Sequence, residues 1–191
     1  MGAVKKIAVL SVQGAFAEQE KRIEDLGAEC IEIIQKEDLM QDFDGMILPG
    51  GESTVQGKLL TELGMLEPLR DRIRSGLPVL GTCAGLILLA GELGGGEHGW
   101  LGTLPVRVRR NAYGRQLGSF HVREVFQGIG RIPMTFIRAP YVESVTEGVE
   151  ILATVDNRIV AVRYANQIGI AFHPELDEDE SIHKMFLSIC L

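Results

Sequence analysis

A lone cysteine stands between two apolar segments of the sequence. Residues 77–82 (LPVLGT) predict a short buried strand, and residues 84–93 (AGLILLAGEL) predict a helix that follows it. A cysteine at such a turn lies at a helix N-terminus, where the helix dipole and free N–H groups favour the thiolate. Small neighbours permit a sharp turn that presents the side chain to solvent, as in a nucleophile elbow. Cys83 is therefore a candidate nucleophile, although a buried structural cysteine accounts for the same pattern.

A thiol nucleophile needs a base, and a later apolar strand offers one at its end. Residues 169–172 (GIAF) are followed by His173, Pro174 and Glu175. Pro174 favours extended geometry at His173, which projects the imidazole beyond the strand. Glu175 is near enough in sequence to orient that ring, so the residue types match a Cys-His-Glu triad. The alternative is a strand-end histidine that simply bonds to a neighbour.

Two adjacent glycines supply a third part of this chemistry. Residues 48–54 (LPGGEST) follow a predicted strand, and the glycines allow main-chain N–H groups to approach a ligand closely. Attack on a carbonyl needs donors for the oxyanion, and the loss of one donor costs about 2.7–4 kcal/mol. The N–H groups of Gly51 and Ala84 are the candidates. A plain strand-to-helix turn with Ser53 or Thr54 as the N-cap accounts for the segment equally well.

Other reactive residue types favour structural roles. Residues 94–99 (GGGEHG) match G-x-G-x-x-G but follow a predicted helix, so we expect a flexible loop rather than a dinucleotide site. Residues 175–183 (ELDEDESIH) place acids at the first turn of the last helix, and no Cys/His spacing indicates a metal. The remaining cysteines and histidines lack an elbow or strand-end setting: Cys30, Cys190, His98, His121 and His183.

The elements that position these residues alternate in the first half of the chain. We expect strands at 5–12, 28–34, 43–51 and 77–82, and helices at 15–27, at 54–76 with a break near Gly64–Pro68, and at 84–93. Strands that alternate with helices predict right-handed crossovers and a parallel sheet. The second half predicts short strands at 104–110, 134–140, 149–156, 158–166 and 167–173, and a final helix at 179–191.

These elements predict one three-layer α/β domain over residues 1–191, with a mostly parallel sheet, some antiparallel strands and helices on both faces. Ligands of such folds bind beyond the carboxyl ends of the strands. The segments 12–15 (VQGA), 48–54, 81–85 (GTCAG) and 172–175 (FHPE) all fall at or after such ends. We therefore expect them to lie on one rim of the sheet.

Composition excludes several classes of protein. The 191 residues are 46% hydrophobic and 24% charged, a balance typical of a globular domain. The formal net charge of −7 and the shortness of the one basic cluster argue against nucleic-acid binding. No apolar run approaches the ~18 residues of a membrane span. Three well-separated cysteines and no convincing signal peptide predict the reducing cytoplasm.

Taken together, the cysteine elbow, the glycine turn and the late H-P-E resemble the class I glutamine amidotransferases. The segments 10–19 (LSVQGAFAEQ), 81–90 (GTCAGLILLA), 109–120 (RRNAYGRQLGSF) and 136–143 (FIRAPYVE) are similar to the glutaminase subunits of pyridoxal 5'-phosphate synthases. The resemblance runs from about Ile7 to the last helix and implies a flavodoxin-like sheet. Small departures at Ser11 and His121 leave the proposed triad untouched.

This resemblance implies a role for each candidate residue. Cys83 would attack the glutamine carboxamide and form a cysteinyl thioester, His173 would activate the thiol and protonate the leaving ammonia, and Glu175 would orient His173. Gln13 would join Gly51 and Ala84 at the oxyanion hole. The residues implied to hold glutamine are Gly51, Glu52, Ser53, Arg110, Ile137 and Arg138. From their types alone, Arg110 and Arg138 would be interpreted as surface ion-pair residues.

The resemblance also implies a partner, a (β/α)₈-barrel synthase in a large hetero-oligomer that uses the ammonia to make pyridoxal 5'-phosphate. The glutaminase itself would need no cofactor and no metal. Two other interpretations stay open on the residues. One is a glutaminase for another synthase, such as that of imidazole glycerol phosphate. The other is a non-enzymatic flavodoxin-like module or thiol sensor, which would not release ammonia from glutamine.

Overall fold

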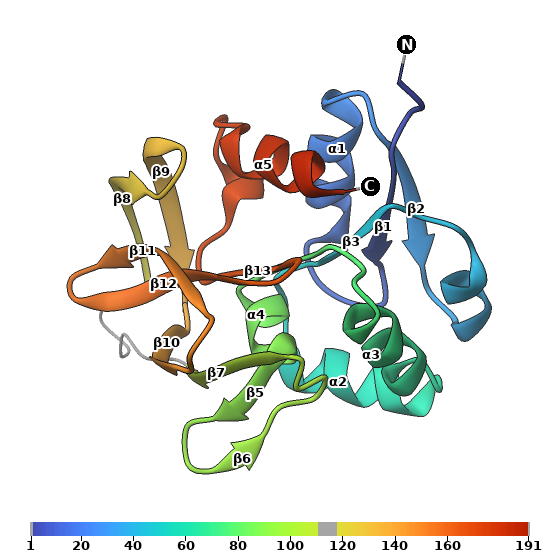
Figure 1. Ribbon diagram of the computed structural model, residues 1–191, viewed down its shortest axis with the longest axis horizontal. Coiled ribbons are helices and arrows are strands. Elements are labelled where there is room, and N and C mark those ends of the chain that lie inside the picture. Colours follow the sequence, from blue (N-terminus) through green and yellow to red (C-terminus); the bar gives the residue numbers. More distant parts are fainter. Residues whose placement is uncertain (1, 111–117, 191) are drawn as a thin grey trace.

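The computed structural model describes residues 2–110 and 118–190, and Figure 1 shows their arrangement. Within these residues the largest sheet has eleven strands, ten of them in the order β2-β1-β3-β4-β13-β12-β10-β7-β5-β6. The eleventh, β11, pairs with β12, and β8 and β9 form a separate two-stranded ribbon. The basic motif 109–120 lies partly outside the described residues, because only 109, 110 and 118–120 belong to them.

The first part of the sheet is parallel and forms the centre of the molecule. Every adjacent pair in the order β2-β1-β3-β4-β13 is parallel. Most positions of β1, β3, β4 and β13 are fully buried, which matches their near-continuous apolar sequences. The strands are β1 (Lys6–Leu10), β2 (Glu29–Ile33), β3 (Gly45–Leu48), β4 (Val79–Thr82) and β13 (Gln167–Ile170).

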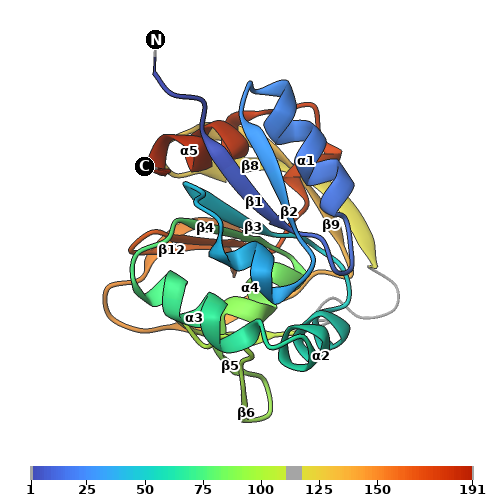
Figure 2. The same cartoon turned by 90° about the vertical axis from the view of Figure 1, so that its right-hand side faces the viewer.

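Helices cover both faces of this sheet (Figures 1 and 2). Helices α1 (Phe16–Asp25) and α5 (Ser181–Ile189) lie on one face. Helices α2 (Ser53–Glu62), α3 (Leu66–Arg74) and α4 (Ala84–Leu89) lie on the other. Two short 3-10 helices, η1 (Lys36–Met40) and η3 (Pro174–Leu176), complete the set. The predicted three-layer α/β architecture is thus confirmed.

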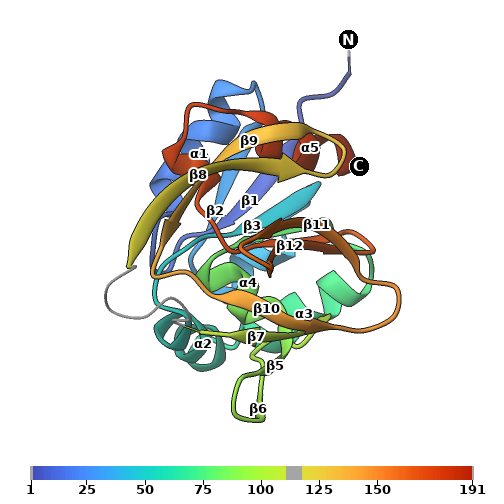
Figure 3. The same ribbon diagram turned by 90° about the vertical axis from the view of Figure 1, so that its left-hand side faces the viewer.

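The second part of the sheet is largely antiparallel. Its pairs are antiparallel except for β5 with β7, which run parallel. These strands are β5 (Ala90–Leu93), β6 (Glu97–His98), β7 (Leu104–Arg109), β10 (Tyr141–Val145), β11 (Glu150–Val155) and β12 (Arg158–Tyr164). The ribbon of β8 (Ser119–Phe126) and β9 (Gly130–Ile137) rises on the same side of the sheet as α5 (Figures 1 and 3).

Three expectations about local structure were wrong or incomplete. The helix predicted over 84–93 ends at Leu89, and the chain continues as β5. All six residues of α4 are buried, so it has no polar face whose periodicity could mark its end. The strands β6, β8 and β10 were not predicted. In the glycine-rich segment 94–99, residues 94–96 form the turn between β5 and β6, and 97–98 are β6 itself, so the segment has no dinucleotide setting.

The ends of two helices also differ from expectation. Helix α2 takes Glu52 as its N-cap, and Ser53 is its first residue, so neither Ser53 nor Thr54 caps it. Helix α5 begins only at Ser181, with Glu180 as N-cap, so the acidic run precedes its first turn. There the Asp179 carboxylate accepts a hydrogen bond from the Ser181 N–H at 2.9 Å. None of the helices described is both long and apolar enough to cross a membrane.

Candidate active site

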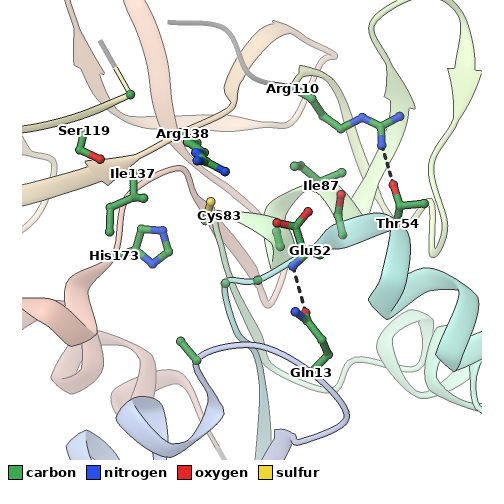
Figure 4. A pocket seen from close by; sticks show the side chains of 16 residues that line it. Gln13, Glu52, Thr54, Cys83, Ile87, Arg110, Ser119, Ile137, Arg138 and His173 are labelled. Carbon is green, nitrogen blue, oxygen red and sulfur yellow. Dashed lines mark hydrogen bonds between the residues drawn. The ribbon is translucent and has the colours of Figure 1, made fainter. Parts of the chain in front are cut away.

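A pocket of about 1010 Å³ opens where the parallel strands end, and Figure 4 shows the side chains that line it. The residues after β1, β3, β4 and β13 all contribute to its wall, as the rim prediction required. Ten of the eleven predicted site residues line the pocket: Gln13, Gly51, Glu52, Ser53, Cys83, Ala84, Arg110, Ile137, Arg138 and His173. The eleventh, Glu175, lies behind His173.

Cys83 sits at a strained turn between β4 and α4. Its φ of 52° lies in the left-handed region, which a non-glycine residue adopts only where the surrounding structure enforces it. Strand β3 comes so close to this turn that Gly85 cannot carry a side chain, because a Cβ there would lie 2.0 Å from the Leu48 carbonyl oxygen. Cys83 is only 8% exposed and lines the pocket. The elbow pattern had predicted a side chain presented to solvent, so the thiol is more enclosed than expected.

His173 lies where the chain leaves β13, and Glu175 orients its ring. Pro174 starts η3, and this short turn brings Glu175 back under the imidazole. The Nδ1 atom of His173 lies 2.7 Å from Oε1 of Glu175, whose side chain is fully buried. The main-chain N–H of His173 is held by the carbonyl of Thr135 at 2.8 Å. The main chain of His173 and one side of its ring are therefore both held, which leaves the other ring nitrogen for Cys83.

The electrostatics of His173 favour a charged ring. Burial lowers the pKa of His173. The hydrogen bonds and negative charges of Cys83 and Glu175 outweigh this effect of burial, so that the pKa is raised to about 10. An imidazolium is thus the form of His173 at neutral pH. In Figure 4 the imidazole and the sulfur of Cys83 face the same part of the pocket.

The glycine turn after β3 packs tightly against the loop after β1. The Gly50 carbonyl accepts a hydrogen bond from the Ala15 N–H at 2.9 Å. Because C=O and N–H point in opposite directions across a trans peptide, the Gly51 N–H is directed away from Ala15. Gln13 Oε1 accepts from the Glu52 N–H at 2.9 Å, so its side chain directly contacts this turn (Figure 4).

The glycines of this turn cannot be replaced without movement. Gly51 has a φ of 155°, and a Cβ there would lie 2.4 Å from Gln13 Oε1. A Cβ on Gly50 would lie 2.5 Å from Cε1 of His173, so the turn and the imidazole are in direct contact. Neither the Gly51 N–H nor the Ala84 N–H donates to another described residue, which leaves both available for a ligand.

The two arginines at the pocket differ in their partners. Arg110 forms an ion pair with Glu97 at 2.8 Å and donates to Thr54 Oγ1 at 3.2 Å, so the ion-pair interpretation holds for it. Arg138 adopts a left-handed backbone with a φ of 44°. It forms no ion pair with any residue in 2–110 or 118–190, and its side chain points into the pocket above Cys83 (Figure 4).

Comparison with known proteins shows to which family a chain with this site belongs. The sequence model of the SNO glutamine amidotransferase family matches residues 9–191. The chain belongs to this family. A crystal structure of a glutamine amidotransferase superposes with a TM-score of 0.91 at 42% identity, covering 96% of this chain and 97% of that one. A structure of PurLQS from Thermotoga maritima, at 18% identity and a TM-score of 0.74, shares the fold and covers 98% of each chain.

Curated relatives of this SNO family chain carry a more specific name. A protein of Desulfitobacterium hafniense is 64% identical over 95% of this chain and 92% of its own length. A protein of Streptococcus pneumoniae is 54% identical over 97% of each chain. Both are named pyridoxal 5'-phosphate synthase subunit PdxT. The resemblance stated from the sequence is therefore confirmed.

The two other cysteines of this glutamine amidotransferase lie outside the pocket. Cys30 and Cys190 are free thiols, and burial raises the pKa of each to about 12. Among the described residues, no group of three or more His, Cys, Asp or Glu side chains is arranged to hold a metal ion.

Several residues near the site were missed from the sequence. Thr54, Ile87, Gly118 and Ser119 also line the pocket. A further set of residues lies behind the triad. Gln19 and Arg22 form hydrogen bonds to Glu175, and Thr82 and His183 form hydrogen bonds to Gln19. His183 had no distinguishing setting in the sequence, yet it is fully buried and bonded to Gln19. A signal did exist, because Gln19 interrupts the apolar stripe Phe16, Ile23, Leu26 of its helix.

Proposed function

We propose that this chain hydrolyses L-glutamine to L-glutamate and ammonia and delivers the ammonia to a synthase that makes pyridoxal 5'-phosphate. The observation that carries the proposal is that Cys83 and His173, 90 positions apart in sequence, meet at one pocket with Glu175 bonded to His173 behind it. Membership of a glutamine amidotransferase family supports glutamine as the substrate. The name of the curated relatives supports the synthase as the acceptor.

The first half of the reaction forms a thioester. Cys83 Sγ, its proton resting on His173, attacks the carboxamide carbon, and the C=O electron pair moves to oxygen. When the carbonyl re-forms, the C–N bond breaks, and the nitrogen takes a proton from His173 and leaves as ammonia. The raised pKa of His173 suits this step, because the ring holds the proton until the leaving nitrogen becomes basic.

In the second half, water regenerates the enzyme. His173, now neutral, accepts a proton from a water molecule that attacks the thioester carbon. The C–S bond then breaks, glutamate leaves, and the pair of Cys83 and His173 returns to its starting state. Glu175 takes no proton; its hydrogen bond to Nδ1 holds the ring in the required orientation throughout.

Oxyanion stabilisation falls to main-chain donors on two different elements. The Gly51 N–H belongs to the turn after β3, and the Ala84 N–H belongs to the first residue of α4. Gln13 supports the turn through its bond to the Glu52 N–H rather than by donating to the oxyanion itself. Donors fixed in advance of the reaction are the ones that stabilise a developing charge most.

Glutamine carries two charged groups that the pocket can match. Arg138, which has no carboxylate partner in the described residues, suits the α-carboxylate. The exposed carboxylate of Glu52 suits the α-ammonium group. Ser53 and Ile137 also line the pocket, and Glu97 already engages Arg110.

The remaining parts of the proposal concern the cellular setting. We assign a single glutaminase domain to residues 1–191, acting in the cytoplasm without a cofactor. The partner is a (β/α)₈-barrel synthase in a large hetero-oligomer, and pyridoxal 5'-phosphate is the product of that complex. The cytoplasm is supported by the three cysteines, all of which are free thiols.

The test is a synthase assay with two nitrogen sources. The complex of this chain with the synthase should form pyridoxal 5'-phosphate from glutamine, and a complex with Cys83→Ala should not. Ammonium salt should restore product in the Cys83→Ala complex, because it bypasses only the glutaminase. Ammonia release without product would instead favour another synthase as partner, and no ammonia release at all would favour a non-enzymatic role.

A further inference from the structure

A row of buried polar side chains lies behind the triad, and none of them lines the pocket. His183 Nε2 lies 2.8 Å from Gln19 Oε1, and Gln19 Nε2 lies 3.1 Å from Oε2 of Glu175. The other carboxylate oxygen of Glu175 bonds to His173. Gln19 and His183 are both fully buried, on α1 and α5, which lie on the same face of the sheet (Figures 1 and 2).

The chemistry of the groups fixes the direction of every bond in this row. A carboxylate only accepts, so the group that Gln19 turns toward Glu175 must be its NH₂. The amide oxygen of Gln19 then faces His183 and can only accept. His183 must therefore carry its proton on Nε2.

The second nitrogen of His183 shows which form of the ring fits. Nδ1 is buried and has no hydrogen-bond partner among the described residues. A proton there would leave a buried donor unsatisfied and a buried charge near Arg22. Burial first, and then the charge of Arg22, lower the pKa of His183 to about 4, against a smaller opposing effect of Glu180. The ring is thus neutral at the pH at which the protein works.

Helix α1 contacts the catalytic segments at two further points. Gln19 Nε2 also lies 3.3 Å from the hydroxyl of Thr82, the residue directly before Cys83. Arg22, one turn further along α1, donates to the main-chain carbonyl of Glu175 at 3.2 Å. One amide group therefore contacts both the strand that ends at Cys83 and the carboxylate that orients His173. The triad carboxylate has no freedom to rotate while these bonds hold.

We propose that Gln19 and His183 are positioning residues of the glutaminase: neutral His183 orients the Gln19 amide, and that amide holds Glu175 in the rotamer that supports His173. The inference rests on the proposed function, because it assigns Glu175 and His173 their roles in glutamine hydrolysis. It predicts that kcat depends on the hydrogen-bond donors of the two side chains. A purely structural role would depend only on the volume and burial of the two side chains.

A near-isosteric pair of variants separates these two cases. His183→Gln keeps an N–H donor at the position of Nε2, and His183→Leu has a similar volume and no donor. We expect His183→Leu to lower kcat about tenfold, by analogy with the loss of partners that orient metal-ligating histidines, with KM within about twofold. His183→Gln should restore kcat to within about threefold of the wild type. Gln19→Met, which removes both donors of the amide, should lower kcat at least as much as His183→Leu.

Phe186→Leu is the control for lost packing, because Phe186 is fully buried on α5 and bonds to none of these groups. It should lower the melting temperature and leave kcat unchanged. The assays are ammonia release by the chain together with its synthase, and the rate at which iodoacetamide modifies Cys83 in the chain alone. Both rates should fall in Gln19→Met and in His183→Leu.

Equal kcat values for His183→Gln and His183→Leu would overturn the proposal, as would a loss in Phe186→Leu as large as that in Gln19→Met. Failure of the proposed function has a different signature, since the wild-type complex itself would then release no ammonia. The alkylation rates decide the positioning role in that case, because they depend on the Cys83–His173 pair and not on glutamine. Unchanged alkylation in Gln19→Met would then contradict it.

Discussion

His173 and Glu175 meet at 2.7 Å although only one residue separates them in the chain. In an extended strand such neighbours lie on the same face but about 6.6 Å apart. The turn into η3 that Pro174 starts directly after His173 brings the two side chains into contact. The same turn buries the Glu175 carboxylate, whose second oxygen accepts a hydrogen bond from Gln19. One proline thus places the base on the pocket and its orienting group behind it.

The triad predicts an unequal response to two conservative changes. His173→Asn should lower kcat for glutamine hydrolysis by about 10³-fold or more, because proton acceptor and donor are lost together. Glu175→Gln should cost less, because an amide still fills the site and only the orientation and charge are disturbed. Steady-state ammonia release with the synthase present measures both. Near-normal turnover in His173→Asn would mean that another group is the base.

Substrate binding should separate the two arginines at the pocket. Arg138→Ala should raise KM for glutamine about tenfold or more and leave kcat nearly unchanged, because the α-carboxylate is held equally in ground and transition states. Arg110→Ala is the matched comparison and should have the smaller effect, because Glu97 already neutralises Arg110. Saturation curves for both variants test this. A loss confined to kcat in Arg138→Ala would move that residue to a catalytic or interface role.

The charged state of His173 predicts the pH dependence of thiol reactivity. Since the pKa of His173 is raised to about 10, the ring beside Cys83 keeps its charge across neutral pH. Alkylation of wild-type Cys83 should therefore be nearly constant between pH 6.5 and 9. His173→Asn removes the charged ring that activates Cys83, so alkylation at pH 7 should fall more than about tenfold. Cys30, with a pKa raised to about 12, is the internal control in the same digest.

The raised pKa of His173 also fixes the sign of its contribution to the pH dependence of the free energy of unfolding. The folded pKa of His173 lies above the ordinary value of 6.5, so the folded state binds the proton more tightly than the unfolded state. The resulting stabilisation is complete below about pH 6.5 and is lost as the pH rises through about 10. The free energy of unfolding of wild type relative to His173→Asn should decline over that range in urea titrations. A difference that grows with pH would contradict the assignment.

The site was more predictable from the sequence than its support. Cys83, the glycine turn and His173 each end a recognisable strand, and parallel strands bring their carboxyl ends to one rim. The end of α4 was wrong because a wholly buried helix carries no polar face. The β8–β9 ribbon was only half predicted, because the polar–apolar alternation of β8 holds only over Ser119–Arg123 and breaks at Glu124, which takes a half-buried position.

Gln19 and His183 show why buried polar contacts resist prediction. Each stands on the buried stripe of its helix, beside Ile23 in α1 and beside Ile182 in α5, so the pattern marks them as exceptions. It does not say which group they meet. Their partners lie 156 and 164 positions away, and only the packing of both helices on one face of the sheet brings them together.

The contact between Gln13 and the glycine turn predicts dependence on the partner. Gln13 holds the Glu52 N–H, so a synthase that touches the loop after β1 would shift the turn that carries the Gly51 N–H. We expect the isolated chain to hydrolyse glutamine poorly, and the synthase to raise kcat more than about tenfold. Such a rise needs only ~1.4 kcal/mol, less than one oxyanion donor supplies. Equal rates with and without the synthase, at saturating glutamine, would exclude this gating.

The central claim is that Cys83 is the nucleophile, and covalent trapping tests it most directly. A chloroketone or diazoketone analogue of glutamine, incubated with the chain and its synthase, should modify one cysteine, and peptide mass spectrometry should place the label on Cys83. Cys83→Ala should take up no label and release no ammonia from glutamine, while its melting temperature stays within a few degrees of the wild type. A label on Cys30 or Cys190, or continued ammonia release by Cys83→Ala, would contradict the account.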